Sequence, residues 1–135
     1  KDLGLPIVIH CREAFDEVFE VLESERDDKL RGIFHCFTGT QDQAQQAISY
    51  RMKLGIGGVV TYKNGKIDQF LRGIPLENIV LETDAPYLSP IPFRGKRNES
   101  SYLKYVIEKM ADVYGLTSQE IALKTSQNAF EIFGI

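Results

Sequence analysis

The chain has 135 residues, of which 43% are hydrophobic and 26% are charged, and its formal net charge is -3. This size and composition predict one soluble globular domain, and the negative balance argues against nonspecific coating of nucleic acid, although a local basic patch could still bind phosphate. No apolar run reaches the roughly 18 residues of a membrane-spanning helix and no signal peptide opens the chain, so we expect no membrane partner.

The first predicted elements are two strands that each end in a histidine. Pro6–His10 is a run of β-branched residues followed by His10, and Gly32–His35 is a second short strand that also ends in a histidine. Between the two strands, apolar residues recur at helical spacing from Glu13 onward, and residues 24–29 form a charged loop. This pattern predicts a strand, a helix and a second strand.

The middle of the chain predicts a second helix, a glycine-containing strand and a short third helix. Thr40 is expected to cap a helix over residues 41–50, and Met52–Val60 is predicted to be the third strand. Its glycines at 55, 57 and 58 indicate close approach of a ligand or of another backbone. Asn64 is predicted to cap a short helix that carries apolar residues from Ile67 to Ile74 on one face.

The fourth predicted strand is Ile79–Leu81, an aliphatic run typical of a strand that is covered on both faces. Glu82 and Asp84 follow it two residues apart, so on an extended backbone both carboxylates point to the same side. The next loop is rich in proline and has three basic residues near its tip, Arg94, Lys96 and Arg97. Acids beside a basic loop favour a metal next to an anionic substrate, and the alternative is an acidic strand end capped by the following turn.

Two further helices are predicted at the end of the chain. Residues 103–114 carry a wide apolar stripe that Gly115 ends, and Thr117–Glu120 is a capping box that opens the last helix. The inner face of that helix is expected to carry Ile121, Ala129, Ile132 and Phe133. The alternation of strands and helices predicts an α/β fold with four parallel strands, outer helices and two C-terminal helices.

Three candidate ligands share one predicted position. His10, His35 and Asp84 each lie at the carboxyl end of a separate parallel strand, and such ends converge on one face in a barrel of alternating strands and helices. Imidazole and carboxylate suit Zn²⁺, Mn²⁺ or Mg²⁺. A single histidine is more often a packed or surface residue, and a set of two histidines and one carboxylate also occurs in iron oxygenases.

The only two cysteines are too few for a disulfide framework, which favours a cytoplasmic protein. Cys11 and Cys36 each follow one of the histidines, so on a strand their side chains would point away from it, toward the helix layer. We therefore interpret both as packing residues.

Taken together, these segments resemble the C-terminal half of a TatD-type metal-dependent deoxyribonuclease, within the amidohydrolase-like metallohydrolases. The matching segments are Leu5–Arg12, Phe34–Gly39, Gly57–Asn64, Leu81–Leu88 and Arg94–Glu99. The resemblance implies strands five to eight of a TIM-type (β/α)8 barrel, so that residues 1–135 form a single partial domain without the N-terminal half of the barrel. It also implies two divalent metal ions (Mg, Mn or Zn) at the mouth, with His10, His35 and Asp84 among their ligands.

The function that follows is hydrolysis of the phosphodiester bonds of DNA. Asp84 would hold a metal and orient or deprotonate the attacking water, with Glu82 as its supporting catalytic partner, and Arg94, Lys96 and Arg97 would meet substrate phosphates. The family's other ligands are not found in these residues, so we expect the chain alone to be a weak or inactive enzyme. Two alternatives remain: a metal-dependent hydrolase of an amide or lactone, and a non-catalytic half-barrel. The expected partners are DNA or another phosphodiester, and either the missing half of the barrel or a second copy of the chain.

Overall fold

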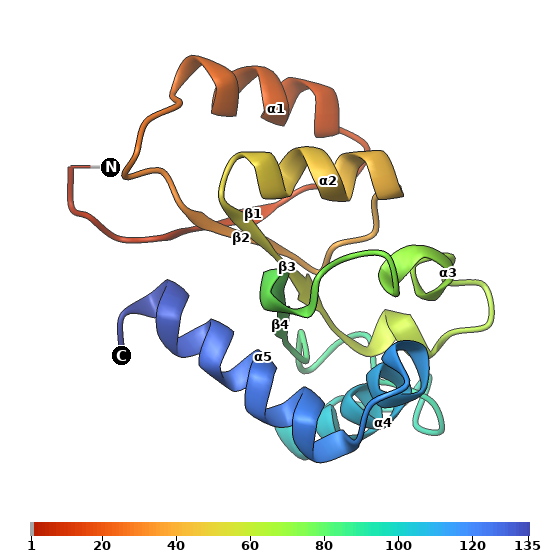
Figure 1. The fold of residues 1–135 in the computed structure, drawn as a ribbon. Coiled ribbons are helices and arrows are strands. Elements are labelled where there is room, and N and C mark those ends of the chain that lie inside the picture. Colours follow the sequence, from red (N-terminus) through yellow and green to blue (C-terminus); the bar gives the residue numbers. More distant parts are fainter. Residues whose placement is uncertain (1) are drawn as a thin grey trace.

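The computed structural model describes residues 2–135 and shows a parallel sheet with helices on both of its faces (Figure 1). The strands are β1 (Ile7–His10), β2 (Gly32–His35), β3 (Met52–Ile56) and β4 (Ile79–Leu81). The α-helices are α1 (Phe15–Ser24), α2 (Gln41–Ser49), α3 (Asp68–Leu71), α4 (Leu103–Tyr114) and α5 (Ser118–Phe133). Three short 3-10 turns are η1 (Gly58–Thr61), η2 (Leu76–Asn78) and η3 (Ser100–Tyr102).

The sheet has the order β1-β2-β3-β4, and every neighbouring pair is parallel. This confirms the predicted α/β fold, since consecutive parallel strands require the crossover helices that the sequence pattern indicated. In the register of β1 and β2, His10 lies directly opposite His35. The two histidines therefore reach the same carboxyl edge of the sheet.

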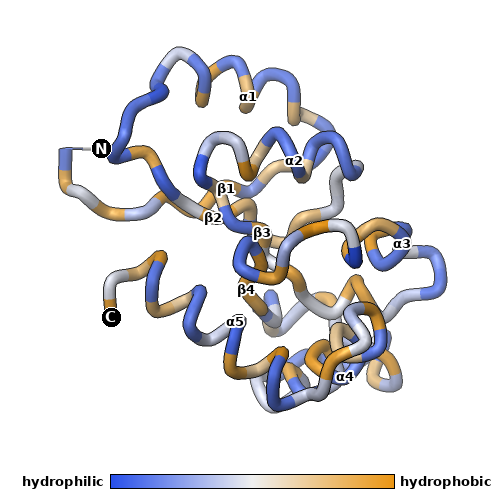
Figure 2. Tube along the Cα trace, in the orientation of Figure 1, coloured by the Kyte–Doolittle hydropathy of each residue, from blue (hydrophilic) through white to orange (hydrophobic). Residues whose placement is uncertain are grey.

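The larger core lies between the sheet and helices α1, α2, α3 and α4. Phe34, Leu54 and Ile79 occupy one row across the strands and are almost completely buried. The rings of Phe15 and Phe19 from α1 pack against Phe34 at centroid distances of 6.0 and 5.8 Å. Burying one such aromatic side chain contributes about 1.5–3 kcal/mol, so this layer holds the strands in place behind the histidines. In Figure 2 the apolar positions of α1 and α2 alternate with polar ones, as an amphipathic helix requires.

The opposite face of the sheet is covered in part by α5. Ile33 and Val80, which alternate with the residues of the larger core, pack against Ile132 and Ala129 of that helix. Asn128 is 1% exposed and donates hydrogen bonds to the carbonyls of Leu76 and Ile79, which fixes α5 to the start of β4. Ile33 of β2 and Val80 of β4 are therefore covered on this face. Val8 of β1 remains 59% exposed.

Three local predictions were wrong. The third strand ends at Ile56 and not at Val60, because the chain turns into η1 where the carbonyl oxygen of Leu88 approaches Gly58. A Cβ atom at position 58 would lie only 2.1 Å from that oxygen. Asn64 does not cap α3, which begins at Asp68 without a side-chain cap. Phe133 is 45% exposed and does not belong to the inner face of α5.

Other boundary signals were confirmed. Thr40 caps α2 as predicted, through a capping box with Gln43 that was not predicted, and Thr117 forms the predicted capping box with Glu120. Gly115 ends α4 with φ 69°, a conformation that glycine adopts without steric cost. The N–H of Thr117 donates to the carboxylate of Glu120 and lowers its pKa. Among residues 2–135, no helix combines the length and the apolar content needed to cross a bilayer.

Candidate metal centre at the carboxyl edge of the sheet

Two histidines lie side by side at the ends of β1 and β2. The centroids of the His10 and His35 rings are 5.3 Å apart, and the ring planes are tilted by 38°. His35 is partly buried, whereas His10 is exposed and its side chain makes no hydrogen bond or ion pair within residues 2–135. The predicted pairing of the two histidines at one edge of the sheet is therefore present.

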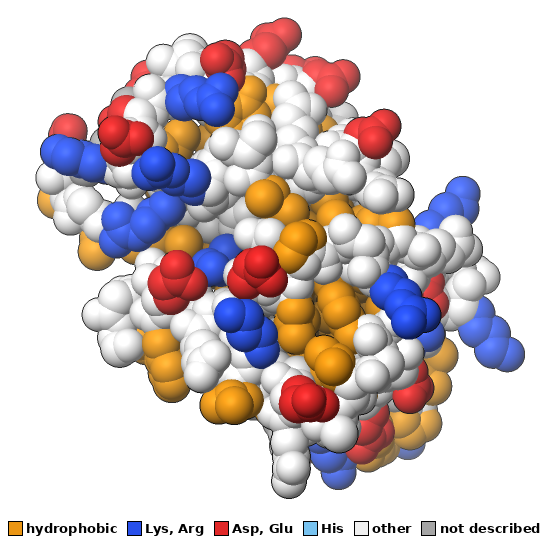
Figure 3. All heavy atoms as spheres, in the orientation of Figure 1, with side chains coloured by type: hydrophobic (Ala, Val, Ile, Leu, Met, Phe, Trp, Pro, Cys, Tyr) orange, Lys and Arg blue, Asp and Glu red, His pale blue; other side chains and the backbone are white. Residues whose placement is uncertain are grey.

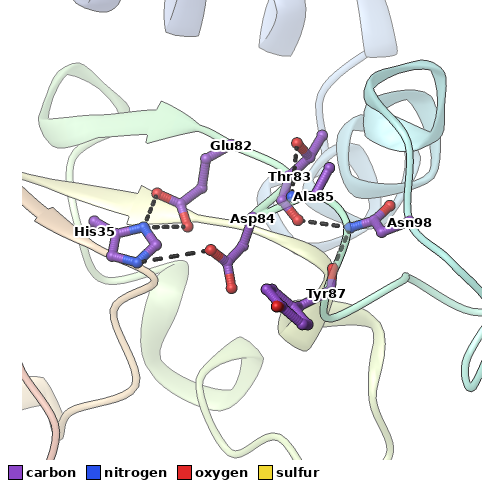
Figure 4. A network of polar contacts seen from close by, with 7 residues as sticks. All are labelled: His35, Glu82, Thr83, Asp84, Ala85, Tyr87 and Asn98. Atoms are coloured by element: carbon purple, nitrogen blue, oxygen red, sulfur yellow. Dashed lines mark hydrogen bonds and ion pairs between the residues drawn. The ribbon is translucent and has the colours of Figure 1, made fainter.

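Two carboxylates flank the ring of His35 (Figure 4). Its Nδ1 lies 3.1 Å from the Glu82 carboxylate, and its Nε2 lies 3.8 Å from Oδ1 of Asp84. Glu82 extends the ladder beyond β4, since its N–H donates to the carbonyl of Ile56. Asp84 has φ 54°, so the two acids converge through a turn rather than on the extended backbone that we expected. The predicted convergence holds, but its geometric reason was wrong.

Gly55 makes room for the Glu82 carboxylate. A Cβ atom at position 55 would lie 2.6 Å from Oε2 of Glu82 and 3.2 Å from the Cα of His35. The sequence predicted close approach of a ligand or another backbone at the glycines of this strand, whereas the group nearest to Gly55 is a side chain of the site. Oε1 of Glu82 is buried and, in the described residues, forms no hydrogen bond of normal geometry, although it too lies 3.1 Å from Nδ1 of His35.

These groups fit part of a divalent metal site. The donors are imidazole nitrogens and carboxylate oxygens, which suit Zn²⁺, Mn²⁺ or Mg²⁺. The 3.8 Å between Nε2 of His35 and Oδ1 of Asp84 is too long for a hydrogen bond. It is of the size expected for two ligands that each bind one ion at about 2.0–2.2 Å. As the side chains stand, no three His, Cys, Asp or Glu residues in the range 2–135 form a group that could hold an ion.

Asn98 holds the loop that carries Asp84, and the sequence patterns did not indicate this role. Its side chain is 3% exposed, and its Nδ2 donates to the carbonyls of Thr83 and Tyr87, both at 2.6 Å (Figure 4). The N–H of Asn98 also donates to the carbonyl of Pro86. One buried amide therefore fixes the backbone on both sides of Asp84. The signal in the sequence was an asparagine at the end of a basic loop, which by itself is typical of any turn.

The basic loop runs past the edge of the site. Arg94 lies over the ring of Tyr62, with its guanidinium carbon 4.4 Å from the ring centroid, and the Tyr62 hydroxyl donates to the carbonyl of Ser89. Burial raises the pKa of Tyr62, while Arg94 lowers it. The side chains of Lys96 and Arg97 are exposed and make no hydrogen bond or ion pair within residues 2–135. The structure thus positions Arg94 and leaves the other two cations facing solvent.

The two cysteines differ from each other. Cys11 is 7% exposed and belongs to the core, as expected for a packing residue. Cys36 has φ 47° and lies near the acids of the site, because the chain turns immediately after β2. Burial raises the pKa of its thiol to about 11, with further contributions from Glu82 and Asp84. Our interpretation of Cys36 as a residue of the helix layer was therefore wrong.

Comparison with known proteins adds independent information. A family model described as TatD related DNase matches residues 1–134. The chain is 43% identical over 136 aligned positions to YabD of Bacillus subtilis, named an uncharacterized metal-dependent hydrolase. This alignment covers 100% of this chain and 53% of YabD. The chain is 33% identical over 138 positions to a protein of Pantoea vagans named 3'-5' ssDNA/RNA exonuclease TatD, covering 98% of this chain and 53% of that one.

The fold is similar to that of solved structures. The crystal structure of YjjV, a TatD homologue of Escherichia coli, aligns with a TM-score of 0.93 at 27% identity and covers 100% of this chain and 52% of YjjV. The chain thus spans about half the length of the relatives that it matches.

Proposed function

The chain belongs to the TatD-related DNase family, and from this premise we propose that the whole protein is a divalent-metal-dependent hydrolase that cleaves phosphodiester bonds of DNA. The observation that carries the proposal is the placement of His35 between Glu82 and Asp84 at the carboxyl edge of a parallel sheet. Relatives named metal-dependent hydrolase and single-stranded DNA/RNA exonuclease support the same reaction class.

We assign the ligands as follows. His10, His35 and Asp84 would hold divalent ions, and we propose two ions per site, of Mg²⁺, Mn²⁺ or Zn²⁺. Bound there, such ions lower the pKa of a water molecule and polarise a phosphoryl oxygen. Asp84 would in addition orient the attacking water and accept its proton. The remaining groups of the chain then serve to position these ligands and the substrate.

Glu82 is a positioning residue in this proposal. With the proton of His35 on Nδ1, the imidazole donates to the Glu82 carboxylate and turns the lone pair of Nε2 toward Asp84. Gly55 keeps the space that this carboxylate needs. Hydrogen bonds of this kind fix the tautomer and the orientation of a ligating histidine, and their loss typically costs about 10–100-fold in metal affinity or activity.

Arg94, Lys96 and Arg97 are proposed to bind substrate phosphates. Arg94 stacks on Tyr62 and so presents its guanidinium with little further loss of rotamer freedom, whereas Lys96 and Arg97 are free to follow the substrate. Arginine offers a planar fork of donors that matches phosphate, and lysine offers a point charge. This basic loop favours a phosphodiester over the amide or lactone substrates of our second hypothesis.

Hydrolysis assays on the whole protein test the proposal. We expect Mn²⁺ or Mg²⁺ to support cleavage of a fluorescently labelled single-stranded DNA, a chelator to abolish it, and excess metal to restore it. Amide and lactone substrates assayed under the same conditions should be turned over poorly. Preferential hydrolysis of an amide or lactone would replace the phosphodiester assignment, and turnover that is insensitive to chelation would refute metal dependence.

The open edges of the sheet support a proposal about partners. β1 and β4 each pair on one side only within residues 2–135, and Val8 is 59% exposed beside the β1 edge. We propose that further strands complete a (β/α)8 barrel here, as the twofold length of the relatives suggests, and that a second copy of the chain is the alternative. Light scattering after size exclusion tests this proposal. Because the edges of the sheet are open, residues 1–135 alone should associate or aggregate. A cooperatively folding monomer of these residues would contradict both.

We also propose a cytoplasmic location. The support is chemical, since both cysteines are free and belong to the core or to the site rather than to a disulfide.

A further inference from the structure

A second cavity lies at the same edge of the sheet as His35, and neither Glu82 nor Asp84 is in its lining. It has a volume of about 430 Å³, and Arg12, Thr38, Thr40, Gln43 and Lys66 line it together with Phe15. We call it the rim pocket. Phe15 belongs to α1 and Gln43 to α2, and the other four residues come from the segments that follow β1, β2 and β3. The rim pocket therefore lies across the ends of three neighbouring strands, and not along the unpaired side of one edge strand.

Two cations of the rim pocket have no partner. Arg12 and Lys66 are exposed, and their side chains make no hydrogen bond or ion pair within residues 2–135. One carboxylate, that of Glu13, lies in the same lining, so the pocket has one excess positive charge. Acidic and basic side chains are interspersed over the face shown in Figure 3, and the net charge of the chain is -3. Two unpaired cations in one concave site are therefore a local feature rather than part of a general basic surface.

The start of α2 forms part of the same wall. Thr40 and Gln43 form the capping box of this nine-residue helix, and both line the rim pocket. Because the capping box uses the N–H groups of both residues, this helix end adds the positive end of the helix dipole, which favours an anion. A neighbouring cavity of 280 Å³ shares Thr38 and Lys66 with the rim pocket and continues toward Asn64. The two cavities together extend from Arg12 to Asn64.

We propose that the rim pocket binds a backbone phosphate of the nucleic-acid strand, outside the bond that is cleaved. The inference rests on the proposed function, and it extends it by assigning Arg12 and Lys66 as substrate contacts in addition to the basic loop after β4. Arg12 would supply paired N–H donors to the phosphate, Lys66 a point charge, and the hydroxyl of Thr38 a further donor. A single strand that crosses both sites would be held at two places on the carboxyl edge.

Binding measured without hydrolysis tests this proposal. The whole protein is titrated into a labelled single-stranded oligonucleotide in the presence of a metal chelator, and binding is measured by fluorescence anisotropy. The titration is repeated between about 50 and 200 mM salt. For Arg12→Ala with Lys66→Ala we expect affinity to fall roughly tenfold at the lower salt. The slope of log K against log salt should become shallower by about 0.7, since the two cations are proposed to bind one phosphate and each neutralised phosphate of a single strand contributes about 0.7. Arg12→Lys with Lys66→Arg should keep most of the slope, because both charges remain.

A matched control separates the site from overall charge. Lys29→Ala with Arg72→Ala removes the same two charges from exposed positions outside the rim pocket. We expect this variant to keep the wild-type slope. A wild-type slope in the Arg12 and Lys66 variant, or an equal loss in the control, would overturn the rim pocket and leave the proposed function intact. Failure of the wild-type protein to bind the oligonucleotide would instead count against the proposed function and the inference together.

Discussion

Replacing Asp84 by Asn is expected to reduce DNA hydrolysis by the whole protein by about a thousandfold while leaving its fold intact. The amide removes a charged ligand and the group that accepts a proton from water, and general-base catalysis alone contributes about 10²–10⁴-fold. Asp84 is 31% exposed in its side chain and lies outside the core, so the substitution costs little packing. Steady-state rates at saturating Mn²⁺, together with thermal unfolding of both proteins, measure the two effects separately. His35→Ala should reduce the rate similarly.

Asp112 provides the matched control for Asp84. Asp112→Asn makes the same chemical change at an exposed position on α4 and should leave the rate unchanged. Near-normal hydrolysis by the Asp84 variant at saturating metal would remove Asp84 from the site. A parallel loss of rate and of folding would show that the residue is structural.

Replacing Asn98 by Ala is expected to destabilise the protein by about 2–4 kcal/mol. The substitution removes both hydrogen bonds from Nδ2 and leaves the carbonyls of Thr83 and Tyr87 without this donor. An unsatisfied buried acceptor costs about 1–3 kcal/mol, and two are affected. Because the same bonds fix the backbone around Asp84, we also expect weaker metal binding. Urea unfolding measures the change in stability, and metal titration of the folded variant measures the change in metal affinity.

Asn64→Ala is the matched comparison for Asn98. Asn64 is exposed and forms no hydrogen bond within residues 2–135, so its replacement should change the free energy of unfolding by less than about 0.5 kcal/mol. Equal effects at the two positions would contradict the anchoring role of Asn98. An unstable Asn98 variant that binds metal normally would show that the amide supports the fold but does not position Asp84.

The features that could be predicted from the sequence depend on neighbouring residues. The strands that end in His10 and His35 are short β-branched or buried segments, and their parallel order follows from the alternation with helices. The helix caps at Thr40 and Thr117 are likewise local patterns with one geometry. Because parallel strand ends share one edge, the approach of His35 and Asp84 could also be predicted.

The features that could not be predicted depend on contacts between distant residues. Asn98 reaches the carbonyls around Asp84 only because the basic loop folds back onto the strand end, and no periodicity indicates that return. Cys36 faces the acids since the chain takes a left-handed conformation directly after β2, where an extended strand would have turned it outward. The early end of β3 has a similar cause, as the backbone at Leu88 meets Gly58.

The most direct test of the account is the position of a bound ion. Crystals of the whole protein grown with Mn²⁺, with anomalous diffraction recorded for manganese, locate the metal without reference to activity. We predict an anomalous peak within about 2.0–2.2 Å of both Nε2 of His35 and an oxygen of Asp84, with Nδ1 of His35 still hydrogen-bonded to Glu82. A protein that is active in Mn²⁺ but shows its anomalous peaks elsewhere, with His35 and Asp84 free of metal, would contradict the assignment.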